Sequence, residues 1–153
     1  MILLDSTLIV AYSNEADENH AKALQVVKDL DRGRYGTPVI TDYIFDEVVT
    51  VMLIRTKSVE KVFELGETLL NSTLLLRIDE HMFSLAWSIF KEQKKPTFSF
   101  TDCTNIAVCR VNGISNIATF DEDFQKLEGY TIVGLSPTTS KDAARHGSSA
   151  YEI

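Results

Sequence analysis

Acidic side chains border apolar segments at separate places along the chain, where their types and positions could support metal chemistry. Asp5 directly follows the apolar run 2–4, and Asp121 follows a second apolar run within the heptapeptide ATFDEDF. Asp102 lies in SFTDCTNIA, at the start of a helical pattern. Carboxylates without a nearby histidine or cysteine are the ligands that Mg²⁺ or Mn²⁺ prefers. Such ions activate water and neutralise charge on a phosphodiester, so the pattern indicates phosphoester hydrolysis.

A fourth acid is expected from the segment TDYIFDEVVTVML, which has an almost entirely apolar helical pattern. Glu47 shares its helical phase with Ile44 and Val51, at the border of the apolar surface, whereas Asp46 lies closer in phase to Thr50. An acid placed against apolar surface needs a partner or a function. Helical phase therefore favours Glu47, and Asp46 remains the alternative.

Three consecutive acids, residues 121–123, would repel one another unless a cation joined them. Asp121 is the candidate ligand, Asp123 is a possible helper, and Glu122 is expected to be solvated surface. Each candidate has a structural alternative, because Asp at a strand end or in the first turn of a helix commonly caps backbone N–H groups. An accidental convergence of four such residues is a much weaker explanation than the same role for one.

Apolar runs alternate with helical patterns along the chain. Strands are expected at residues 2–4, 73–78, 116–119 and 130–133, and residues 38–40 form either a short strand or the lead-in to a helix. After a polar loop that follows Asp5, helices are expected at 17–31, 43–56, 58–70, 79–95, 101–113 and 121–126. This alternation predicts an α/β fold, a three-layer α/β/α sandwich with a central parallel sheet. Ligands bind outside the carboxyl ends of such strands, so Asp5, Asp102 and Asp121 are expected on one edge.

The bulk properties are those of a single domain. The chain has 153 residues and a formal net charge of −7, which argues against a generic nucleic-acid binder but not against an enzyme that meets phosphate through bound cations. We expect one domain over residues 1–135 and a polar tail over 136–153. The composition of the tail is typical of a disordered segment, although packing or a partner could order it. The absence of a signal-like segment or an apolar stretch of ~20 residues predicts a cytoplasmic protein without membrane contact. Cys103 and Cys109 are expected to be buried small hydrophobes, so zinc chemistry is not expected.

Four motifs together resemble the PIN domain, the fold of VapC-type toxin ribonucleases and of stand-alone PIN proteins in prokaryotes. The motifs are DSTLIVAY, TDYIFDEVVTVML, SFTDCTNIAVCRVNGI and NIATFDEDF, and the resemblance runs from about Met1 to Val133. It implies an α/β/α sandwich that cleaves RNA with Mg²⁺ or Mn²⁺. The residues that match the family's acidic positions are Asp5, Glu47, Asp102 and Asp121, with Asp123 at a position that is sometimes acidic.

The resemblance also implies partners. The implied substrate is single-stranded RNA, pairing as a homodimer is typical of the family, and many members are inhibited by a small antitoxin that plugs the acidic cleft.

Two other functions remain as alternatives. A phosphotransfer enzyme could use an acidic strand end, but a phosphatase of this type needs a second Asp where Thr7 stands. A PIN-like module could instead bind RNA or protein without cutting it. The complete set of acids argues against a module that only binds. Calorimetric titration with Mn²⁺ distinguishes the nuclease from such a module, which has no need of a metal site.

Overall fold

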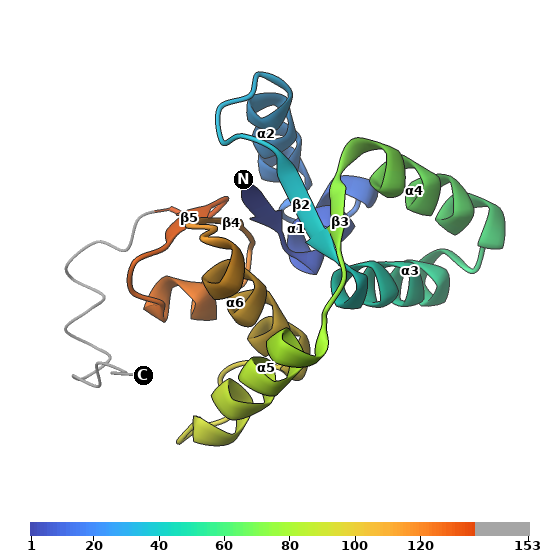
Figure 1. Ribbon diagram of the computed structural model, residues 1–153. Helices are drawn as coiled ribbons and strands as arrows, with labels where there is room; N and C mark the ends of the chain where they lie inside the picture. Colours follow the sequence, from blue (N-terminus) through green and yellow to red (C-terminus); the bar gives the residue numbers. More distant parts are fainter. Residues whose placement is uncertain (137–153) are drawn as a thin grey trace.

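A five-stranded parallel sheet forms the centre of the protein. The computed structural model describes residues 1–136, so the predicted tail falls outside the described residues from position 137 onward. The strands are β1 (Ile2–Leu4), β2 (Pro38–Thr41), β3 (Leu74–Leu76), β4 (Asn116–Ala118) and β5 (Thr131–Val133), in the order β3-β2-β1-β4-β5 (Figure 1). All neighbouring strands are parallel. The central strands are apolar throughout because helices cover both faces of the sheet.

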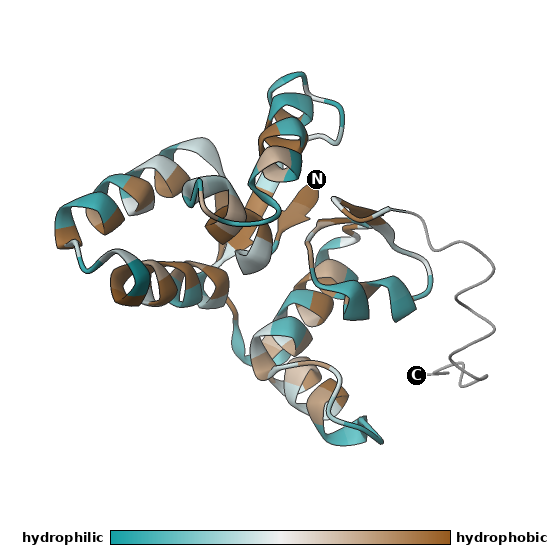
Figure 2. Ribbon diagram, turned by 180° about the vertical axis from the view of Figure 1, so that it is seen from behind, coloured by the Kyte–Doolittle hydropathy of each residue, from teal (hydrophilic) through white to brown (hydrophobic). Residues whose placement is uncertain are grey.

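Within residues 1–136, six α-helices and one short 3₁₀ helix connect the strands. They are α1 (Ser6–Ser13), α2 (His20–Asp31), α3 (Asp42–Thr56), α4 (Val59–Ser72), α5 (Glu80–Glu92), α6 (Phe100–Asn112) and η1 (Glu122–Lys126). From β1 the chain moves outward through α1 to α4 as far as β3, and then returns through α5 and α6 to β4. Right-handed crossovers place α1 to α4 on one face and α5 and α6 on the other. The predicted three-layer sandwich is therefore confirmed, and Figure 2 shows apolar strands flanked by helices in which apolar and polar residues alternate.

Most of the predicted helix starts are confirmed because side chains cap them. The hydroxyls of Thr41 and Ser58 accept hydrogen bonds from the backbone N–H groups of Ile44 (3.0 Å) and Lys61 (3.3 Å). Asp79 accepts from the N–H of Met82 at 2.8 Å. Residues 38–41, which the sequence left open, form a strand between β1 and β3.

The polar loop expected after Asp5 is wrong, because residues 6–13 form helix α1. Leu8, Ile9, Val10 and Ala11 are buried, so the segment is an apolar helix despite its flanking Ser and Thr residues. The next helix also begins later than predicted, at His20. Before it, the Asp17 carboxylate accepts from the N–H of Asn19 at 3.0 Å, which holds residues 17–19 in a turn.

Two predictions about composition can also be compared with the structure. Cys103 and Cys109 are buried free thiols within α6, as expected. Within residues 1–136, no helix is long and apolar enough to cross a bilayer.

Candidate functional site

Asp5 is the buried centre of the candidate site. It is the residue between β1 and α1, and only 2% of it is exposed. Its Oδ2 accepts hydrogen bonds from the hydroxyls of Thr7 (2.7 Å) and Thr119 (2.8 Å), and its Oδ1 accepts from Nδ2 of Asn105 (3.3 Å). A buried carboxylate needs such donors, and here they come from α1, α6 and the end of β4.

The two threonine hydroxyls are fixed by backbone groups on their other side. The Thr7 hydroxyl accepts from the N–H of Phe120, and the Thr119 hydroxyl accepts from the N–H of Asp121, each at 3.0 Å. Because their oxygens accept these bonds, both hydroxyls are left to donate to Asp5. This network ties the end of β4 to the start of α1 and holds the Asp5 carboxylate in one orientation.

Asp102 lies in the first turn of α6, where it forms a capping box with Ser99. Its carboxylate accepts from the backbone N–H of Ser99 at 2.7 Å, and its own N–H donates to the Ser99 hydroxyl at 3.1 Å. Burial raises the pKa of Asp102 to about 6, the bonds from Ser99 oppose that rise, and the charges of Asp5 and Asp121 add to it. Carboxylates whose pKa is raised by burial and by neighbouring negative charges are common in functional sites.

The charge of Asp5 also raises the pKa of Glu47 and of Asp121. Burial raises the pKa of Glu47, the Ser6 hydroxyl lowers it, and the charges of Asp5 and Asp46 raise it. Burial also raises the pKa of Asp121, and the charges of Asp123 and Asp5 add to that rise. The N–H of Asp123 and the charge of Lys126 oppose it.

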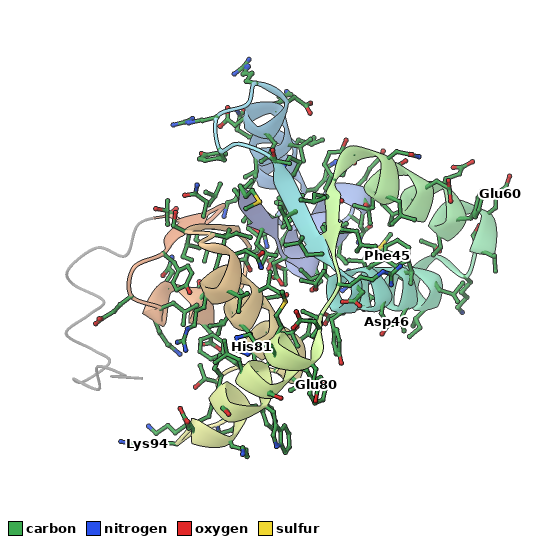
Figure 3. All side chains as sticks on the ribbon, viewed as in Figure 1. Phe45, Asp46, Glu60, Glu80, His81 and Lys94 are labelled. Atoms are coloured by element: carbon green, nitrogen blue, oxygen red, sulfur yellow. The ribbon has the colours of Figure 1, made fainter. Side chains whose placement is uncertain are left out.

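Asp5 is thus a shared negative neighbour of an acid on α3, an acid on α6 and the acid that caps η1. The charge of Asp5 raises the pKa of Glu47, Asp102 and Asp121, and the charge of Asp121 also raises that of Asp102. Asp46, the alternative to Glu47, is exposed on α3 (Figure 3). Asp123 lies beside Asp121, where its carboxylate forms an ion pair with Lys126.

A model of the PIN domain matches residues 2–130 of this sequence. The chain belongs to the PIN domain family. A search of curated proteins finds no significant match.

Solved structures with the same fold include bacterial toxins. VapC20 from Mycobacterium tuberculosis, described as a toxin that cleaves the sarcin-ricin loop, has a TM-score of 0.71 at 23% identity, over 82% of this chain and 93% of that one. A toxin–antitoxin complex from Klebsiella pneumoniae has a TM-score of 0.61 at 13% identity, over 86% and 96% of the two chains. VapBC2 from Rickettsia felis, bound to a promoter DNA fragment, has a TM-score of 0.61 at 12% identity, over 86% and 97%.

The donors in this PIN domain fit a hard divalent cation in their chemistry. All of the candidate ligands are oxygens, and the Oδ1 of Asn105 is a further buried oxygen without a hydrogen-bond partner among the described residues. Within residues 1–136, however, no three His, Cys, Asp or Glu side chains are grouped closely enough to hold an ion as they stand. Asp102 and Asp121 each direct one oxygen to a backbone N–H, which leaves the second oxygen of each carboxylate available to a ligand.

Asn105 is the site residue that the sequence prediction missed. It is fully buried on α6, three positions after Asp102, and donates to Asp5. The available signal was a polar amide within the otherwise apolar helical segment CTNIAVC, since a buried amide needs partners. Thr7 was considered only as a departure from a phosphatase motif, although its hydroxyl makes the shortest hydrogen bond to Asp5.

A hollow lies beside the acids, between α1, α3 and the segment before α2. Ser6, Thr7, Glu47 and Phe120 line it, together with Arg55, which forms an ion pair with Asp17 at 3.8 Å. Of the four acids, Glu47 lines this hollow and is reachable from it, whereas Asp5 is buried.

Proposed function

We propose that this PIN domain is a metal-dependent endoribonuclease that hydrolyses phosphodiester bonds of single-stranded RNA, and that it is the toxin of a toxin–antitoxin pair. The observation that carries the proposal is the acidic group centred on Asp5, where burial and shared negative charge raise the pKa of three further carboxylates. Such a group is relieved by a cation, and a cation is what an RNA phosphate needs beside it. The enzyme would act in the cytoplasm.

In this proposal Asp5, Glu47, Asp102 and Asp121 hold Mg²⁺ or Mn²⁺, with Asp123 as a helper. The ion, when bound, would supply charge neutralisation at the phosphate and a water of lowered pKa. Asp5 contributes a carboxylate whose orientation is set by Thr7, Thr119 and Asn105. Glu47 borders the hollow through which RNA would reach the acids.

Neither alternative accounts for the site as well. A phosphotransfer enzyme would need Asp5 as a nucleophile, but Asp5 is 2% exposed and its Oδ2 accepts two hydroxyl protons, which weakens it for attack. A module that only binds would have no reason to keep three carboxylates with raised pKa values around a fourth.

Metal removal provides the first test. The chain with Mn²⁺ is expected to cleave a labelled single-stranded RNA, to stop when EDTA is added, and to resume when Mn²⁺ is restored in excess. Product lengths on a denaturing gel would show internal cleavage. Cleavage that continues in EDTA would contradict metal dependence, and a chain that binds RNA but neither binds Mn²⁺ nor cleaves the RNA would favour the binding module.

The antitoxin part of the proposal has a candidate surface in an apolar groove between α3 and α4. Phe45, Val49 and Leu53 line it from α3, and Val59 and Phe63 line it from α4. Val59 is 73% exposed and Phe63 is 64% exposed, which is unusual for large apolar side chains. Figure 3 shows Phe45 between the two helices. An amphipathic helix of an antitoxin would bury these side chains.

The homodimer part of the proposal has a candidate surface on α5. Phe83, Trp87 and Phe90 are exposed there, and their rings lie 5.3–6.1 Å from that of Phe100 on α6. Tyr43 on α3 contacts the same ring at 6.0 Å. A second copy of the chain placed on these aromatic residues would remove them from water.

One sedimentation experiment tests both partners. The chain alone is expected to sediment as a dimer and, when co-expressed with the small protein encoded by the adjacent gene, as a larger complex. Phe63→Ser is expected to lose only the small protein, and Trp87→Ser is expected to lose only the dimer. A monomeric wild-type chain would contradict the dimer, and a complex unaffected by Phe63→Ser would exclude the groove.

A further inference from the structure

A second cavity, separate from the acidic group, lies between α5, α6 and the segment from η1 to β5. Its volume is about 290 Å³, just below the ~300–1,000 Å³ typical of small-molecule sites. Apolar side chains form its inner wall, including Phe98, Ile106 and Leu127. Lys95, Arg110 and Lys126 also line it.

The aromatic wall of this cavity is fixed in place by Gln93. The Nε2 of Gln93 donates to the carbonyl of Phe98 at 3.1 Å, and its Oε1 accepts from the N–H groups of Thr97 (3.2 Å) and Phe98 (2.7 Å). The ring of Phe98 also packs edge-on against Phe124 of η1, with the centroids 5.6 Å apart. A preformed wall of this kind lowers the entropy lost when a planar ligand binds.

The charges around the cavity favour one phosphate group. Three cations come from three different segments, and two acids, Glu92 and Glu128, also line the cavity, which leaves an excess of one positive charge. Within residues 1–136, Lys95 and Arg110 form no salt bridge, whereas Lys126 is paired with Asp123. Lys95 and Arg110, the two cations without a salt bridge, match a single phosphate of about two negative charges better than a di- or triphosphate.

Tyr130 adds a hydrogen-bond donor. Burial is the main cause that raises the pKa of its hydroxyl, and the nearby Arg110 opposes the rise. The hydroxyl is therefore protonated at neutral pH and can donate to an anion.

Helix η1 links the cavity to the acidic group along the chain. Asp121 caps η1 at its start, and Lys126 is the last residue of that helix, about 10 Å further along for a 3₁₀ rise of ~2 Å per residue. The α3–α4 groove has no cation among its lining residues, where Glu67 is the one charged side chain, so it does not offer a phosphate site of this kind.

We infer that this cavity binds a nucleoside monophosphate unit, with the base against Phe98 and the phosphate at Lys95 and Arg110. The unit is either a nucleotide of the RNA strand that reaches the acidic group or a free nucleotide. The first of these sources rests on the proposed ribonuclease function, and the second does not.

Calorimetry with the full-length chain in EDTA tests the site without a metal at the acids. AMP is expected to bind saturably, ribose 5-phosphate at least about fivefold more weakly because it lacks a base, and inorganic phosphate more weakly still. Arg110→Gln and Lys95→Gln are each expected to weaken AMP binding about tenfold. Lys94→Gln is the matched control, because Lys94 is next to Lys95 but does not line the cavity and projects from the end of α5 (Figure 3).

Fluorescence anisotropy with a single-stranded RNA distinguishes the two sources. The test uses Asp5→Asn, which is expected not to cleave, with and without Arg110→Gln. Weaker RNA binding in the double variant, with competition by AMP, supports a nucleotide of the strand. AMP binding that depends on Arg110, together with unchanged RNA binding, supports a free nucleotide. The inference is overturned if AMP does not bind and Arg110→Gln leaves RNA binding unchanged. Neither measurement depends on cleavage, so failure of the ribonuclease proposal would be seen separately.

Discussion

Replacing Asp5 with asparagine is expected to abolish RNA cleavage while leaving the fold intact. The charge of Asp5 acts on Glu47, Asp102 and Asp121 together, so its loss removes the centre of the acidic group. Without that charge the pKa values of the other three acids should fall, and the attraction for a divalent ion should weaken. We expect kcat/KM for a single-stranded RNA in Mn²⁺ to fall by a factor on the order of 10³, as when a group that stabilises transition-state charge is lost.

The matched control for this prediction is Asp46→Asn. Asp46 is an exposed acid whose charge also raises the pKa of Glu47, but it acts on Glu47 less than Asp5 does. It has no effect on Asp102 or Asp121, so its loss should leave cleavage nearly unchanged. Circular dichroism and thermal unfolding would confirm that both variants fold. Cleavage by Asp5→Asn at the wild-type rate would remove Asp5 from the catalytic machinery.

Replacing Asp102 with asparagine is expected to inactivate the enzyme and to stabilise the metal-free chain at neutral pH. The pKa of Asp102 is raised from 3.8 to about 6, chiefly by burial. The folded chain therefore keeps this proton to a higher pH than the unfolded chain does. The stability that this group contributes is complete below about pH 4 and is lost as the pH rises through about 6. Asparagine resembles the protonated acid and avoids that loss.

The expected gain is modest but has a clear pH dependence. A shift of about two pKa units corresponds to roughly 3 kcal/mol, which partial exposure of the carboxylate reduces to roughly 1–2 kcal/mol. This amounts to a rise in Tm of about 2–8 °C at pH 7.5 in EDTA and almost none at pH 4. Asp79→Asn is the control, because Asp79 also binds a backbone N–H at a helix start but is exposed. A loss of stability in Asp102→Asn at pH 7.5 would show that the carboxylate has a structural role in α6.

The sequence was sufficient to predict the layers of the fold, and the same local patterns indicate the acids that we propose as ligands. The run 2–4 is wholly apolar and is followed by Asp5. This pattern is typical of a buried parallel strand with a polar residue at the edge of the sheet. Caps at Thr41, Ser58 and Asp79 depend on local hydrogen bonds that the residue types alone specify. The helical phase of Glu47 indicated the half-buried position that it occupies beside exposed Asp46.

The parts that were not predicted depend on contacts between distant residues. Helix α1 was missed because its Ser and Thr residues look polar, although the sheet and neighbouring helices bury the segment between them. Asn105 lies 100 positions from Asp5 in the sequence, so local patterns do not show that the two are paired. The capping box of Asp102 is local, but its raised pKa results from burial and from charges on other segments.

Calorimetric titration of the metal-free chain with Mn²⁺ tests the central claim most directly, because it asks whether acids from four segments form one cation site. We expect saturable binding to the wild-type chain, and affinity at least about tenfold weaker in Asp5→Asn, Glu47→Gln, Asp102→Asn and Asp121→Asn. Asp79→Asn should bind like the wild type. Wild-type affinity in Asp5→Asn, or no binding of Mn²⁺ to the wild-type chain, would contradict the account.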